Sequence, residues 1–461
     1  MEYCGRGSKI INMKELDINF VREQFPVFQN PKTSNFAFFE NAGGTYVPKQ
    51  VIEKLNDFMT TKKVQPYGDF GPSIEAGNEM DNSISKIAEL LNINNDEFMI
   101  GPSTTMNMFL LSNAVRSWLN DGDEIIVTNQ DHEANIGAWR KLSEHGIKIN
   151  EWKFNPDSAE LELDELKNLI TEKTKFICVC HTSNVIASIN NLKEIITLAH
   201  QNNIKVVGDG VAYMAHDIAD LKDLDIDFYG FSLYKTYGPH LALLYGKRDL
   251  LLETKNLNHE FLEGSVPYTL NPGGPNHEEL GCLSGITDYY ETLYDHHFGE
   301  NNLDLHRKGK KVFELVSKHE EVLMKELIEF LKTKKNIKMI GKQTHARCDR
   351  MPTVSFTVKD KSSLHVAQEA GRNNIGIRNG EFYAWRCLQG LGIEPNDGVV
   401  RVSMVHYNSI EEVRKLIGFL DKTIQNFLYF FLSLSSVLLT LSSKYLPDCG
   451  THPNSDQIRV T

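Results

Sequence analysis

Between residues 80 and 250 the sequence alternates amphipathic helical stretches with short apolar runs rich in β-branched residues. This alternation is typical of a parallel sheet whose strands are joined by crossover helices. The sequence therefore predicts a doubly wound α/β domain. Its strands are expected at 124–128, 175–180, 205–208 and 241–245, and its helices at 106–119, 136–144, 163–170 and 192–201.

A second region has a different order of elements. Between 306 and 425 the pattern predicts helix, strand, helix, strand and helix without a parallel alternation, which favours a smaller α+β domain. We expect four parts along the chain: an N-terminal segment, 1–35, packed on the small domain; the large α/β domain, 36–300; the small α+β domain, 301–426; and a tail, 427–461.

Charge and cysteine content narrow the class of protein. A net charge of −12 and no Lys/Arg-rich block argue against a nucleic-acid partner. The seven cysteines are an odd number, scattered without a disulfide framework or metal-ligand spacing, and no secretory signal opens the chain. We expect a cytoplasmic protein with reduced thiols, no bound metal, and small-molecule or protein partners.

The tail leaves one alternative open. Residues 423–443 carry no charge, which approaches the length of a membrane span, but six Ser or Thr residues between 433 and 443 dilute it. Membrane association through 427–441 is therefore an alternative that we do not favour.

A candidate anion cradle lies where Gly101 ends a short apolar run. The small hydroxyl residues Ser103, Thr104 and Thr105 follow and open an amphipathic helix. Free backbone N–H groups and the helix dipole would face an anion there. The alternative is an ordinary N-cap.

Two charged residues mark the predicted site. Asp209 closes an apolar strand, at the sheet edge where ligands of open α/β folds bind, and a buried carboxylate there needs a cation such as a protonated pyridine nitrogen. Lys235 stands among aromatic and small residues, where poor hydration would free its amine as a nucleophile toward an aldehyde. The alternatives are a turn aspartate and a lysine that reaches solvent from an apolar patch.

The run Asp209-Gly210, followed at an interval by Phe231-Ser232 and by Lys235-Thr236-Tyr237-Gly238-Pro239, resembles a known family. It is similar to the class V aminotransferase branch of fold type I pyridoxal phosphate (PLP) enzymes, and most of all to the cysteine desulfurase and selenocysteine lyase group. The resemblance covers about residues 36–425. It implies a large α/β domain with a mixed or parallel sheet, a small α+β domain, PLP as cofactor, and a homodimer with shared active sites.

The resemblance assigns cofactor contacts residue by residue. Lys235 is expected to form the Schiff base, and Asp209 to pair with the pyridine nitrogen. His132 matches the histidine that stacks on the ring and relays protons, and Asn184 matches the residue that bonds the ring hydroxyl. Ala212 stands where the family has a glutamine near that hydroxyl.

The same carry-over assigns the phosphate contacts. Thr104, Thr105 and Ser232 match phosphate ligands, which supports the anion cradle. Tyr234 replaces a phosphate-binding histidine but can still donate a hydrogen bond. Gly274 replaces a threonine that reaches the phosphate of the neighbouring subunit.

Substrate contacts are expected from two other places. Arg401 falls where the family keeps an arginine for the substrate carboxylate, and its planar fork suits bidentate pairing. Asn41, Ala42 and Gly43 resemble the loop that flanks this carboxylate. For Arg401 alone, a surface ion pair is the alternative interpretation.

One position breaks the pattern of the cysteine desulfurases. Tyr383 occupies the place of their nucleophilic cysteine, and a phenol cannot take up a sulfur atom. Cys387 lies four residues later and is interpreted as a packed cysteine rather than a displaced nucleophile.

The sequence therefore predicts a PLP enzyme that acts on a small amino acid, as a cysteine desulfurase-like lyase. An aminotransferase or epimerase, or a catalytically silent PLP-binding protein, remain the alternatives. The sequence does not select the substrate.

Overall fold

The computed structural model describes residues 14–424, and contacts divide the chain into two units, Met1–Leu416 and Ile417–Thr461. Of the second unit only 417–424 are described, and these residues are helical. The apolar stretch 427–441 lies outside the described residues. None of the helices described in the structure is long and apolar enough to cross a membrane.

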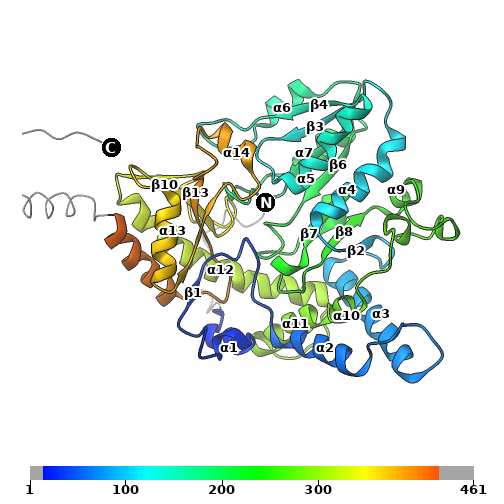
Figure 1. The fold of residues 1–461 in the computed structure, drawn as a ribbon, viewed down its shortest axis with the longest axis horizontal. Helices are drawn as coiled ribbons and strands as arrows, with labels where there is room; N and C mark the ends of the chain where they lie inside the picture. Colours follow the sequence, from blue (N-terminus) through cyan, green and yellow to red (C-terminus); the bar gives the residue numbers. More distant parts are fainter. Residues whose placement is uncertain (1–13, 425–461) are drawn as a thin grey trace, which may run out of the picture. The chain divides into compact units, whose positions relative to one another are not determined.

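The first unit contains a seven-stranded sheet in the order β2-β8-β7-β6-β5-β3-β4 (Figure 1). Strands β4, β3, β5, β6 and β7 run parallel, whereas β8 is antiparallel to both β7 and β2. All the strands of the described residues, in chain order, are β1 Ala37–Phe38, β2 Phe98–Gly101, β3 Glu124–Thr128, β4 Lys148–Trp152, β5 Thr174–Cys180, β6 Lys205–Asp209, β7 Phe228–Ser232, β8 Ala242–Gly246, β9 Ile337–Met339, β10 Thr353–Val358, β11 Ile375–Gly376, β12 Arg378–Gly380 and β13 Val399–Ser403.

Helices cover both faces of this sheet. All the helices of the described residues, in chain order, are α1 Ile18–Glu23, α2 Lys49–Thr61, α3 Gly71–Leu91, α4 Thr104–Ala114, α5 Glu133–Lys141, α6 Leu163–Leu169, α7 Leu192–Gln201, α8 Leu221–Leu224, α9 Arg248–Glu253, α10 His277–Gly281, α11 Ser284–Phe298, α12 Leu305–Lys332, α13 Ser363–Arg372 and α14 Trp385–Gly390. Alternate side chains of each strand enter opposite cores: Ile125 and Val127 pack with α4 and α5, whereas Ile126 packs in the core that includes α3, α7, α11 and α12. The result is a three-layer α/β/α arrangement, which confirms the predicted fold class.

The antiparallel direction of β8 departs from the purely parallel pattern. A parallel connection needs a crossover of a dozen or more residues, usually with a helix. Between β7 and β8 lie only residues 233–241, which form a single 3₁₀ turn, Leu233–Lys235, and a loop. The chain therefore reverses here, and this tight reversal contains Lys235.

A second sheet has four antiparallel strands in the order β12-β13-β10-β9. A short parallel pair, β1 with β11, joins residues 37–38 to residues 375–376. The N-terminal segment contacts the end of this region, because Arg22 pairs with Glu412 at 2.9 Å and donates a hydrogen bond to the carbonyl of Tyr407. Residues distant in sequence are thereby held close to β13, where Arg401 lies.

Candidate active site

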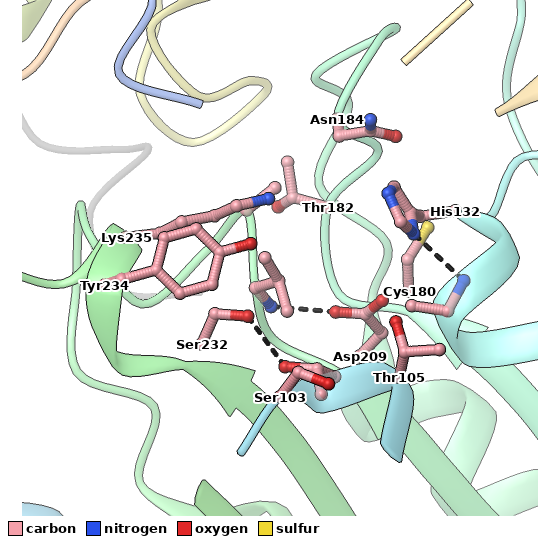
Figure 2. Close-up of a pocket in the computed structure, with 14 residues that line it drawn as sticks. Ser103, Thr105, His132, Cys180, Thr182, Asn184, Asp209, Ser232, Tyr234 and Lys235 are labelled. Carbon is pink, nitrogen blue, oxygen red and sulfur yellow. Dashed lines mark hydrogen bonds between the residues drawn. The ribbon is translucent and has the colours of Figure 1, made fainter. Parts of the chain in front are cut away.

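A pocket opens at the carboxyl edge of the large sheet, lined by fourteen residues (Figure 2). Strands β3, β5, β6 and β7 are parallel and end on this side, so the segments that follow them converge there. The lining residues are Ser103, Thr104, Thr105, His132, Ala134, Cys180, Thr182, Asn184, Asp209, Val211, Ala212, Ser232, Tyr234 and Lys235. All eight residues that the sequence assigned to the cofactor are among them.

The N-terminus of α4 forms one wall. Ser103 caps this helix by accepting a hydrogen bond from the N–H of Met106, at 3.2 Å, so the N-cap alternative holds for Ser103 itself. Thr104 and Ser232 share a hydrogen bond of 2.8 Å between their hydroxyls, which fixes α4 against the end of β7. First-turn N–H groups of a helix have no intrahelical acceptor, so this wall can bind an anion.

Lys235 projects into the pocket from the turn after β7 (Figure 2). Protein atoms surround its amine, and this burial, together with the positive charge of Arg401, lowers the pKa of Lys235 to about 8. Asp209 and Glu40 act in the opposite direction. An amine with this pKa is partly neutral near pH 7, so it can act as a nucleophile.

Asp209 lies at the end of β6 and is buried. Its Oδ1 accepts a hydrogen bond of 2.8 Å from the N–H of Val211, and in the described part of the chain no cation lies within ion-pair distance of it. Burial raises the pKa of Asp209 to about 6, and Lys235 opposes that shift only in part. Gly210 is required by packing, since a Cβ there would lie 2.2 Å from the ring of Tyr229. The site thus holds a carboxylate that still needs a cationic partner.

His132 is the N-cap of α5 and reaches the pocket beside Asn184 (Figure 2). Its Nδ1 accepts a hydrogen bond of 2.9 Å from the N–H of Ala134, so the ring proton lies on Nε2. Burial, followed by the charges of Lys235 and Arg401, lowers the pKa of His132 to about 3. The imidazole is therefore neutral and keeps one N–H to donate.

Two buried oxygen atoms in this pocket lack a partner among the described residues, Oδ1 of Asn184 and Oγ1 of Thr182. The amide nitrogen of Asn184 is engaged, since it donates to the carbonyl of Phe382 at 2.9 Å. A buried polar atom without a partner costs free energy, so a ligand with matching groups would be stabilised here. Thr182 and Cys180 are pocket residues that the sequence interpretation missed.

The expected substrate residues lie outside this lining. Arg401 is on β13 and is buried, and Asn41, Ala42 and Gly43 form a turn beside it. Asn41 Nδ2 and Ala42 N–H donate to the carbonyl and hydroxyl of Ser403, each at 2.8 Å. Arg401 is paired with a carboxylate that the sequence analysis did not single out, Glu40, at 3.0 Å. The structure therefore brings the four predicted residues together, and it also gives Arg401 a resident partner.

Tyr383 and Cys387 have opposite surroundings. Tyr383 is 70% exposed, has a left-handed backbone with φ of 56°, and places its ring centroid 5.4 Å from that of His132. Cys387 is fully buried in an apolar cluster with Phe154 and Leu388, and this burial raises the pKa of its thiol. A thiol in such surroundings is a poor nucleophile, which agrees with its interpretation as a packed cysteine.

Comparisons with known proteins point in one direction. The family profile "Aminotransferase class-V" matches residues 37–276 and 304–416. The aminotransferase-like protein FGM3 of Gibberella zeae is 33% identical over 89% of this chain and 99% of its own, and the cysteine desulfurase-like protein ustD of Aspergillus flavus is 33% identical over 89% and 91%. The crystal structure of the cysteine desulfurase CsdA from Escherichia coli matches with a TM-score of 0.75 at 24% identity, over 89% of this chain and 98% of that chain, and so shares its fold.

Proposed function

Because the chain belongs to the class V aminotransferase family, whose members depend on pyridoxal phosphate, we propose that it is a cysteine desulfurase-like lyase. Its substrate is a small amino acid, and its cofactor is bonded to Lys235. One observation carries the proposal. A single pocket gathers a lysine of lowered pKa, a carboxylate and a buried amide oxygen that have no cation and no donor, respectively, among residues 14–424, and a helix N-terminus.

These residues fit the groups of pyridoxal phosphate. Lys235 suits the aldehyde, Asp209 the protonated ring nitrogen, and Asn184 Oδ1 the ring hydroxyl as a hydrogen-bond acceptor. When bound, the cofactor supplies an electron-accepting ring to the amine of the substrate. Asp209 would hold a proton on the ring nitrogen, because a buried carboxylate strongly favours a cation beside it.

We assign the phosphate group of the cofactor to the wall formed by α4 and the end of β7. Thr104, Thr105 and Ser232 offer hydroxyl donors there, and the first turn of α4 offers backbone N–H groups. Tyr234 lies over this wall and contributes its own hydroxyl. Its ring stacks on His240 with centroids 4.4 Å apart, which limits the movement of the phenol.

Two residues move protons. Burial lowers the pKa of Lys235 to about 8, so its amine could accept a proton from the substrate or return one to it. His132 is neutral and carries its proton on Nε2, so it can donate there without gaining a charge first. It lies beside Asn184 in the same pocket (Figure 2).

The substrate carboxylate is assigned to Arg401, whose Nε is buried and has no partner among the described residues. The turn of Asn41, Ala42 and Gly43 holds β13 in place through Ser403 and borders that carboxylate site. Arg401 cannot lose its proton under ordinary conditions, so it remains a cation for this purpose.

A lyase without a protein thiol is favoured by the position of Tyr383 and the burial of Cys387. The sulfur atom would pass to a thiol in solution rather than to the protein, while the electron pair of the broken C–S bond stays on the substrate carbon and is protonated, because Tyr383 cannot form a persulfide and the thiol of Cys387 is enclosed.

We further propose that the protein is a homodimer. Tyr67, Phe70, Phe261 and Tyr268 are all more than half exposed, and such large apolar side chains gather at protein interfaces. Analytical ultracentrifugation tests this assignment, with Phe261→Glu as the variant that should shift the protein toward monomer.

The test of function compares the purified protein with Lys235→Ala after addition of pyridoxal phosphate. We expect a visible absorbance band from the lysine-bound cofactor in the first and none in the variant. L-cysteine is then added together with dithiothreitol, whose two thiols accept the sulfur atom and are oxidised to a disulfide as sulfide is released, and sulfide and alanine are quantified; their release supports the lyase. Transfer of the amino group to an added keto acid would instead identify an aminotransferase, and the absence of a visible band would refute the proposal.

A further inference from the structure

Glu40 is a charged residue beside the active site that the mechanism above does not use. Its two carboxylate oxygens lie 3.0 Å and 3.2 Å from Nη2 of Arg401. The side chains of Arg401 and Glu40 are 3% and 10% exposed. Because arginine keeps its proton, the two form an ion pair that is largely removed from water.

The carboxylate of Glu40 is fixed in place by its surroundings. Its Oε2 accepts a hydrogen bond of 2.9 Å from the N–H of Gly43, and its Oε1 lies 3.6 Å from Nη1 of Arg378. A Cβ at position 43 would lie 2.5 Å from Oε2, so glycine leaves the room that this carboxylate occupies. Glu40 is therefore a built part of the site rather than a side chain that happens to lie near Arg401.

The remaining surface of the Arg401 guanidinium is also occupied, except at one edge. Nη1 donates to the carbonyl of Asn184 at 3.2 Å, and the ring of Phe382 covers one face with its centroid 3.6 Å from the guanidinium carbon. Only Nε, which is buried, has no partner among the described residues. Nε is therefore a donor left for a ligand carboxylate, on an arginine that is already paired with Glu40.

We propose that Glu40 is a specificity-determining residue, a resident carboxylate on Arg401 that makes simple carboxylic acids bind weakly and leaves the site selective for amino acids. This inference rests on the proposed function, in which Arg401 receives the substrate carboxylate. For an incoming anion, repulsion from Glu40 opposes the attraction to Arg401, whereas the charge of Arg378, whose side chain is 67% exposed, is screened by solvent. An amino acid has a second source of affinity, since its amine bonds to the cofactor, whereas a simple carboxylic acid has none.

Arg401 and Glu40 also act in opposite directions on Lys235. Burial is the main cause of the lowered pKa of Lys235; Arg401 lowers that pKa further, and Glu40 raises it. The pair therefore presents the active lysine with a smaller net charge than Arg401 alone would. An exchange of Glu40 for a neutral residue exposes both the lysine and any ligand to the full charge of Arg401.

The experiment measures propionate binding to the cofactor-loaded protein by isothermal titration calorimetry, in the wild type and in Glu40→Gln. We expect the Kd to fall by about tenfold or more in Glu40→Gln, because the anion then compensates an unpaired buried arginine. The control Glu151→Gln removes a carboxylate paired with Arg140 on the edge strand β4, and should leave the Kd unchanged. In the double variant Glu40→Gln with Arg401→Gln, the tighter binding of propionate should disappear.

A smaller gain in Glu40→Gln, or a gain that persists in the double variant, overturns the inference. If Glu40→Gln does not fold, the Kd values of the wild type for propionate and for propionamide are compared instead. A preference below about tenfold supports a neutralised arginine, and a larger one overturns it. The visible band of the bound cofactor is recorded first: its absence in the wild type refutes the proposed function, whereas a normal band with unchanged Kd values refutes only the role of Glu40.

Discussion

The lowered pKa of Lys235 predicts how fast the protein bonds its cofactor as the pH changes. Burial, as the main cause, lowers the pKa of this amine from the ordinary value of 10.5 to about 8. At pH 7 it makes the neutral amine about 300-fold more abundant than in an unperturbed lysine. Because only the neutral amine attacks an aldehyde, the rate of bond formation should rise about tenfold per pH unit below pH 8 and level off above it.

Rapid mixing of the cofactor-free protein with pyridoxal phosphate measures this rate through the visible absorbance, and Lys235→Ala gives the background from other lysines. Burial is the larger cause of the shift and Arg401 the second, so Arg401→Gln should move the midpoint toward higher pH without restoring 10.5. A rate that still rises steeply at pH 9 in the wild type would show that the amine is not desolvated as the structure indicates.

Three other changes test separate parts of the site. Asp209→Asn should raise the Kd for pyridoxal phosphate by about tenfold or more, measured by equilibrium dialysis, because it removes the carboxylate that pairs with the ring nitrogen; an unchanged Kd would contradict that pairing. Ser232→Ala should raise the Kd for pyridoxal phosphate by about tenfold and leave the Kd for pyridoxal, which has no phosphate, unchanged. An equal rise in both Kd values would place Ser232 away from the phosphate. Cys387→Ala should keep the rate of sulfide release from L-cysteine within about threefold, since burial keeps its thiol protonated; loss of that release would make Cys387 the missing nucleophile.

Much of the fold followed from periodicity along the chain. The predicted strand 124–128 and helix 192–201 have the bounds of β3 and α7 in the structure, because the spacing of apolar residues in a strongly periodic segment indicates whether it is a strand or a helix. The direction of β8 did not follow from periodicity, because an apolar run has the same pattern in either direction. The short connection 233–241 was the signal that could have revealed it.

The residues assigned to the cofactor line one pocket; some of them carry a local signal in the sequence, and the others were assigned by resemblance to the family. Asp209 ends an apolar strand, Lys235 follows one within an aromatic turn, and Thr104 opens a helix. Glu40 carried no such signal. It is separated from Arg401 by 361 positions, and the residues near it in the sequence do not indicate an ion pair.

The sequence by itself determined which chemical groups are present and which strands and helices carry them, because side-chain type and periodicity are properties of the chain. The tertiary structure decided which of these groups are paired. Arg401 is neutralised by Glu40, Asp209 has no cation in ion-pair range among the described residues, and Cys387 is enclosed whereas Tyr383 faces solvent. Burial and the distance between charges set each pKa and each affinity, and both exist only once distant segments have been brought together.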